Sequence, residues 1–143
     1  MKILAVDFDG VISDSALKSL FVSHNAYCQY FGLKVKKNFG GKLFTFENWE
    51  EIKKQYKKEM DNYRRLRSYI ELSGDFFVII KIMEEQVQIK DQQEFIAYRS
   101  QLQFDYQFFR ELFFEEKEEW QKKSFRKGKP FIVPFNRNIL VLK

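Results

Sequence analysis

Two carboxylates lie two residues apart near the start of the chain, in the run Asp7-Phe8-Asp9-Gly10. On an extended backbone, residues two apart point the same way, and Gly10 allows a sharp turn that can re-aim the second carboxylate. Carboxylates held this close repel, raise each other's proton affinity and favour a hard divalent cation such as Mg²⁺. Asp7 and Asp9 are therefore the candidate metal-binding and catalytic residues.

The flanking sequence predicts the elements that would position these aspartates. The run Ile3-Leu4-Ala5-Val6 is apolar on both faces, which is typical of a strand buried in a parallel sheet. A helix is expected after the glycine, with Asp14 or Ser15 able to cap its start and Gly32 to end it. Because ligands bind at the carboxyl ends of strands in α/β sheets, the two carboxylates would lie at such an edge.

The order of strand, aspartates, glycine and helix resembles the start of a haloacid dehalogenase-like (HAD) hydrolase. The family's first motif is D-x-D-G-[TV], which Asp7-Phe8-Asp9-Gly10-Val11 matches, and Ile12-Ser13-Asp14-Ser15 resembles the usual run into the first helix. The resemblance implies Mg²⁺-dependent hydrolysis of a small phosphomonoester through an aspartyl-phosphate intermediate. The expected partner is thus a small phosphorylated metabolite.

The same resemblance assigns a role to each residue of the loop. Asp7 would attack phosphorus, and Asp9 would protonate the leaving group and then activate water. The Asp7 carboxylate and the Asp9 main-chain carbonyl would bind Mg²⁺. Backbone N–H groups of Phe8 and Asp9 would hold phosphate oxygens.

Two simpler interpretations compete for the aspartate loop. It can be an Asx-type turn that caps the first helix and does no chemistry. It can also be a calcium loop of the EF-hand type, but the glutamate that such a loop carries twelve residues along is replaced by Lys18. The strand and helix around the motif favour the HAD interpretation over both.

The resemblance implies an α/β fold with a HAD-like, Rossmann-type core. Of that core this chain would hold the first strand alone, which leaves the core incomplete. Residues 1–15 would form the first core strand and catalytic loop, 16–123 a mostly α-helical cap region, and 124–143 a return segment toward the rest of the core. No Asp or Glu follows Glu119, so the later acidic metal ligands of the family are missing. We therefore expect a truncated, split or frameshifted product, inactive alone and possible to complement with a core fragment.

Periodicity predicts mostly helices between residues 16 and 123, apart from a loop over 33–45. Apolar residues spaced by three and four favour one long helix over 46–72. The stretch FFVIIKIM at 76–83 fits a strand or a buried helix, and we predict a helix with Asp75 as its cap. Asp91 and Glu94 have the spacing of a capping box, and a further helix is expected over 106–123.

Composition is that of a globular domain, with 45% hydrophobic and 31% charged residues in 143. No apolar run approaches the roughly 20 residues of a membrane helix, so no membrane partner is expected. The single cysteine, Cys28, fits a reducing cytoplasm. We interpret Cys28 as a small buried side chain and His24 as a packing or solvated residue, neither of them catalytic.

Charge is divided into blocks along the chain. Residues 34–67 carry eleven Lys and Arg against five Asp and Glu, whereas residues 68–123 carry seven against twelve. Such blocks usually mark solvated helix faces. A nucleic-acid binder is the weakest alternative, because net charge and aromatic residues are its whole support. The other alternative is a non-catalytic helical module, derived from a HAD protein, that binds a partner.

Overall fold

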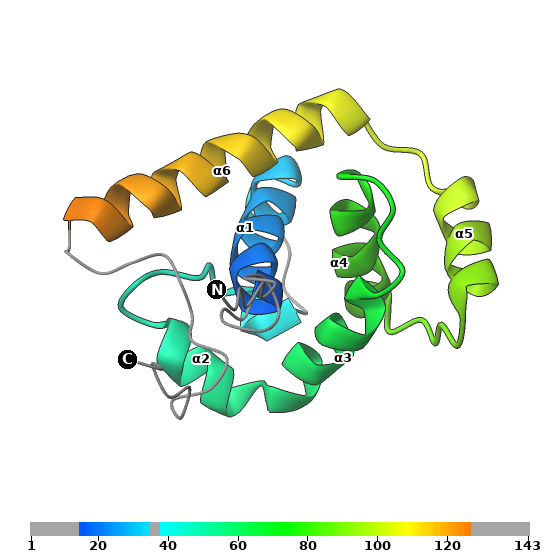
Figure 1. Ribbon diagram of the computed structural model, residues 1–143, viewed down its shortest axis with the longest axis horizontal. Helices are drawn as coiled ribbons and strands as arrows, with labels where there is room; N and C mark the ends of the chain where they lie inside the picture. Colours follow the sequence, from blue (N-terminus) through cyan, green and yellow to red (C-terminus); the bar gives the residue numbers. More distant parts are fainter. Residues whose placement is uncertain (1–14, 35–37, 127–143) are drawn as a thin grey trace, which may run out of the picture.

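The computed structural model describes residues 15–34 and 38–126, and every helix within them is shown in Figure 1. The helices are α1 Ser15–Tyr30, the short 3-10 turn η1 Asn38–Gly41, α2 Trp49–Gln55, α3 Lys57–Arg67, α4 Asp75–Glu85, α5 Gln92–Gln101 and α6 Tyr106–Arg126. These two ranges contain no strand. None of their helices has the length and apolar character needed to cross a membrane.

The prediction of an α/β fold is therefore wrong, because the described part of the chain is all-helical. The expected first strand, at residues 3–6, lies outside the described residues. A parallel sheet needs a second strand to pair backbone N–H and C=O groups. The apolar runs that follow pair these groups within helices instead, so the described residues form a helix-on-helix fold.

Helix α1 forms the centre of the molecule (Figure 1). It packs against α6, α4 and α3, and every residue from Leu20 to Cys28 is buried. A helix that is buried on all sides needs partners all round. Gly32, two residues after the last residue of the helix, has a φ of +60°. The Leu33 N–H donates to the Cys28 carbonyl and the Gly32 N–H to that of Gln29, so the predicted glycine stop is confirmed as a Schellman motif.

The prediction of one long helix over 46–72 is wrong, because the chain forms two helices in this range, α2 and α3, that meet at Tyr56. The apolar stripe is real, since Ile52, Met60 and Leu66 are buried. At Tyr56, however, the backbone leaves helical geometry, with φ −115° and ψ 43°. The Tyr56 ring packs edge-on against Phe39, 5.6 Å between centroids. This contact with a distant segment accompanies the break, and periodicity carries no sign of it.

The predicted helix at 76–83 is confirmed, because FFVIIKIM lies within α4 and most of its side chains are buried. Asp75 is not its N-cap, however. It is the first residue of the helix, and its Oδ2 accepts the backbone N–H groups of Glu71 and Leu72, at 2.8 and 3.0 Å. The predicted Asp91 cap of α5 is confirmed, because the Glu94 N–H donates to Asp91 Oδ1 at 2.9 Å. The Glu94 side chain accepts the Lys90 N–H at 2.9 Å, and not the Asp91 N–H that a complete capping box would use.

Helix α6 runs from Tyr106 through the expected end at 123 to Arg126. It buries Phe109, Phe113 and Trp120 against the rest of the fold. Helix α5 lies at the outer edge of the molecule (Figure 1) and buries one side chain, Phe95. Residues 102–105, which have no regular secondary structure, join the two helices.

Candidate functional site

The residues with predicted catalytic roles, Asp7, Phe8 and Asp9, lie outside the described residues. Helix α1 begins at Ser15, where the sequence places the helix after the aspartate loop. Within residues 15–34 and 38–126, no three His, Cys, Asp or Glu side chains gather as a metal-binding group. The geometry that can be described is therefore that of three polar clusters in the helical part.

The first cluster pairs His24 with Cys28, one turn apart on α1. His24 Nε2 lies 3.0 Å from the Lys42 carbonyl oxygen and 3.5 Å from Cys28 Sγ. Burial lowers the pKa of His24 to about 4, despite the bond to the Lys42 carbonyl, which raises it. Burial raises the pKa of Cys28 to about 12, with a smaller contribution from Glu84. Both groups are neutral at pH 7, so the pair lacks the thiolate that nucleophilic catalysis needs.

The rings around His24 explain why it stays neutral. Its imidazole meets Phe39 and Phe44 edge to face, at 5.0 and 5.4 Å between centroids. Its Nδ1 is buried without a hydrogen-bond partner. The prediction that Cys28 is a small buried residue is confirmed, and His24 is a packing residue that ties the 38–44 segment to α1.

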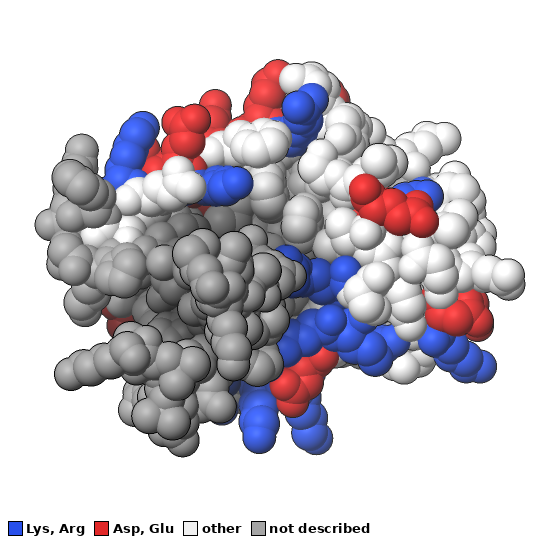
Figure 2. All heavy atoms as spheres, in the orientation of Figure 1, with Lys and Arg blue, Asp and Glu red and all other residues white. Residues whose placement is uncertain are grey.

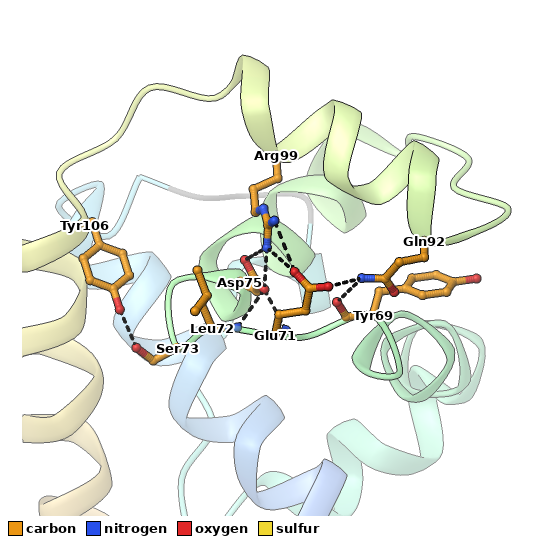
Figure 3. Close-up of polar contacts among 8 residues, drawn as sticks. All are labelled: Tyr69, Glu71, Leu72, Ser73, Asp75, Gln92, Arg99 and Tyr106. Atoms are coloured by element: carbon orange, nitrogen blue, oxygen red, sulfur yellow. Dashed lines mark hydrogen bonds and ion pairs between the residues drawn. The ribbon is translucent and has the colours of Figure 1, made fainter.

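The second cluster joins α5 to the start of α4 (Figure 3). Arg99 donates to both oxygens of Asp75, each at 3.1 Å, and to Glu71 Oε2 at 3.3 Å. Gln92 donates to Glu71 Oε1 and to the Tyr69 carbonyl. Because Arg99 and Gln92 of α5 bond to residues at and just before the start of α4, the cluster attaches α5 to the fold.

The third cluster is centred on the Glu116 carboxylate of α6. Its Oε1 accepts from Asn25 Nδ2 at 2.7 Å and from Trp120 Nε1 at 3.0 Å. Its Oε2 accepts from Gln29 Nε2 at 2.8 Å. Asn25 is itself fixed, because it also donates to the Phe44 carbonyl and accepts the Phe44 N–H. Three neutral donors thus hold one carboxylate between α1 and α6.

Glu116 is one of the residues that line a pocket of about 340 Å³. The pocket is lined by Phe44, Thr45, Phe46, Glu47, Glu116, Trp120 and Lys123. The Phe46 and Trp120 rings stack at a tilt, 4.6 Å between centroids. Its size is at the lower end of the range for small-molecule sites, about 300–1,000 Å³. The pocket thus combines aromatic side chains with a carboxylate that Asn25 and Gln29 hold in place.

Sequence reasoning missed this site. Glu116 was not among the predicted site residues, yet its side chain bonds to Asn25 and Gln29 of α1. Asn25 and Glu116 are 91 residues apart, so no local pattern connects them. The nearest signal is the Glu116–Trp120 spacing of four, which places both side chains on one helix face.

The described residues of the basic block at 34–67, which exclude 35–37, do not form a uniformly positive surface. Figure 2 shows Lys and Arg gathered along the lower edge, where α2 and α3 lie, with acidic side chains among them. Glu50, Glu51 and Glu59 lie in the first turns of these helices. Arg64 pairs with Asp61 at 3.1 Å. This mixture is what solvated helix faces usually carry.

No protein-family model, curated protein or solved structure matches the chain.

Proposed function

We propose that this chain contributes the aspartate loop of a Mg²⁺-dependent phosphohydrolase of the HAD type, which acts on a small phosphomonoester. The observation that carries the proposal is the run Asp7-Phe8-Asp9-Gly10-Val11, placed shortly before a helix that begins at Ser15. The proposal concerns the chemistry of this loop. It does not depend on the α/β fold class, which the helical structure overturned.

The loop supplies the two groups that the reaction needs. An Asp7 oxygen attacks phosphorus, the bond to the leaving oxygen breaks, and Asp9 gives that oxygen its proton. Asp9 then takes a proton from water, whose oxygen attacks the phosphorus of the aspartyl-phosphate. Phosphate leaves, and the Asp7 carboxylate is restored. Bound by the Asp7 carboxylate and the Asp9 carbonyl, Mg²⁺ would neutralise phosphate charge.

The helical part supports the proposal as a cap region. It has its own apolar core around α1, so it can hold its shape beside a catalytic loop. A family member also needs a Ser or Thr, a Lys and an acidic pair. The proposal includes a core segment that supplies these groups. Cys28, a buried free thiol, supports a reducing compartment such as the cytoplasm.

A non-catalytic helical module that binds a partner is the second candidate. The observation in its favour is on α6, where Phe108 and Phe114 are 45% and 42% exposed. Exposed aromatic side chains are common at protein interfaces. This candidate predicts that the aspartates do not affect function, so substitution of Asp7 and Asp9 separates the two.

Kinetics of aspartate variants test the proposal. The chain alone should show no turnover of aryl phosphates, whereas supply of the core segment should give Mg²⁺-dependent activity. Asp7→Asn should abolish it, because the attacking carboxylate is gone. Asp9→Asn should slow it by roughly 10²–10⁴-fold, and more for alkyl than for aryl phosphates, whose leaving groups need less protonation. Activity that survives in Asp7→Asn, or equal losses on both substrates in Asp9→Asn, would contradict the assignment.

A further inference from the structure

Helix α5 is held to the fold by little buried apolar surface. It buries one side chain, Phe95, whose ring centroid lies 5.8 Å from that of Tyr69. Helix α1, by contrast, is buried at every residue from Leu20 to Cys28. Burial of apolar surface is the main stabilising contribution to a fold, and an isolated helix of ten residues is marginal in water. Helix α5 therefore stays helical only while its contacts hold it to the rest of the fold.

Polar side chains supply further attachments of α5. Arg99 donates to Asp75 in the first turn of α4 and to Glu71 just before it (Figure 3). Tyr98 donates to Glu85 at the end of α4. The side chains of Arg99 and Glu71 are 25% and 51% exposed. Because water competes for exposed groups, such bonds stabilise the attachment less than buried ones would.

The chain is anchored to the fold on both sides of α5. Before α5, the Ile89 side chain is buried, and its carbonyl accepts from Arg65 of α3 at 2.6 Å. After α5, the Phe104 ring stacks on Phe77 of α4, with 4.1 Å between centroids and 3° between planes. The segment between these anchors, residues 90–103, is therefore able to leave the fold while the chain on either side stays in place.

We propose that residues 90–103 form an arm that opens as one local unit, in which α5 unfolds while α1, α3, α4 and α6 stay packed. The Arg99–Asp75 ion pair is the latch of this arm, because it joins α5 to a carboxylate that is 1% exposed. Opening exposes Phe95 and the part of the Tyr69 ring that it contacts. The arm thus gives the fold a second state with new apolar surface. This inference does not depend on the proposed phosphohydrolase chemistry.

The rest of the fold loses little when the arm opens. The Asp75 carboxylate keeps the backbone N–H groups of Glu71 and Leu72 as donors. The packing of α1 against α3, α4 and α6 does not involve the arm. Local opening therefore costs less free energy than global unfolding. It also exposes less surface, so it should respond less to denaturant.

Amide hydrogen exchange followed by NMR tests the opening. Amides of residues 96–101, within α5, should have protection factors at least about tenfold lower than those of the buried run 20–28 of α1. Addition of about 1 M urea should raise α1 exchange roughly tenfold and α5 exchange much less. Arg99→Met should raise α5 exchange about fivefold, as expected for loss of a partly exposed ion pair.

Ile52→Val is the matched control. It shortens a buried side chain of α2, which lies on the opposite side of the molecule from α5 (Figure 1). The substitution destabilises the closed and open forms equally, so it should raise α1 exchange roughly fivefold and leave α5 exchange unchanged. The proposal would be overturned by equal protection and equal urea dependence in α1 and α5. It would also be overturned by α5 exchange that rises as much as α1 exchange in Ile52→Val, or that does not change in Arg99→Met.

Discussion

The Asp75 carboxylate is 1% exposed and lies 3.1 Å from the Arg99 guanidinium, so that the first turn of α4 is joined to the last turn of α5. The two partners differ in their surroundings. Asp75 is buried and also accepts two backbone N–H groups, whereas the Arg99 side chain is a quarter exposed. Removal of the acid should therefore cost more than removal of the base.

Asp75→Ala should lower the free energy of unfolding by roughly 3 kcal/mol, because it leaves the Glu71 and Leu72 N–H groups without this acceptor and leaves Arg99 with Glu71 as its one remaining acidic partner in the cluster. Arg99→Met should lower the free energy of unfolding by about 1 kcal/mol, since the Arg99 side chain is partly exposed and solvent screens its interaction with Asp75. Urea denaturation of both variants measures the difference. Arg110→Met, on the exposed face of α6, is the control and should change little. A larger loss for Arg99→Met than for Asp75→Ala would contradict this account of the cluster.

Comparison of alanine substitutions at Gly40 and Gly32 separates two effects on the free energy of unfolding: backbone strain at positive φ and a steric clash of the added Cβ. Both glycines have left-handed backbone conformations, with φ angles of +62° at Gly40 and +60° at Gly32. A Cβ added at Gly40 would lie 2.8 Å from Tyr56 Oη, whereas a Cβ added at Gly32 would have no atom within 4 Å. Gly32→Ala should cost about 1 kcal/mol for backbone strain alone. Gly40→Ala should cost clearly more. The addition of Tyr56→Phe should recover the difference, as measured by thermal unfolding, and failure to recover it would show that the clash is not the cause.

His24 should make the fold less stable in acid. Its pKa is lowered from 6.5 to about 4 by burial, so between these values the unfolded chain binds a proton that the folded chain does not. Stability then falls as pH drops from 6.5 toward 4, by about 3 kcal/mol in total. His24→Gln keeps a donor toward the Lys42 carbonyl but does not titrate. Its unfolding free energy should depend less steeply on pH over this window, and an unchanged slope would exclude His24 as the source.

Local features of the fold were predictable from the sequence. Gly32 ends α1 and Asp91 caps α5 because each acts on backbone groups within a few residues. The burial of α4 follows from its continuous apolar run. The break at Tyr56 was not predictable, since it accompanies a contact with Phe39 across the fold. The α/β prediction failed for a related reason: it extended one apolar run, at residues 3–6, to a sheet that the described residues do not form.

The two candidate sites differ in the same way. Asp7 and Asp9 could be proposed from the sequence because the two carboxylates lie two residues apart. The pocket lined by Glu116 could not be predicted from the sequence. The Glu116 carboxylate is positioned by Asn25 and Gln29 on another helix, and the residues that line the pocket come from the segment at 44–47 and from α6. Only packing of α1 against α6 brings these side chains together.

The proposal that Asp7 is a nucleophile is tested most directly by capture of the aspartyl-phosphate intermediate. The chain, supplied with the core segment and Mg²⁺, would be mixed with an aryl phosphate, quenched in acid and analysed by peptide mass spectrometry. We predict one added phosphoryl group on Asp7, removed by hydroxylamine as an acyl phosphate should be, retained in Asp9→Asn and absent in Asp7→Asn. Turnover without a labelled Asp7 peptide, or a label on another residue, would contradict the account.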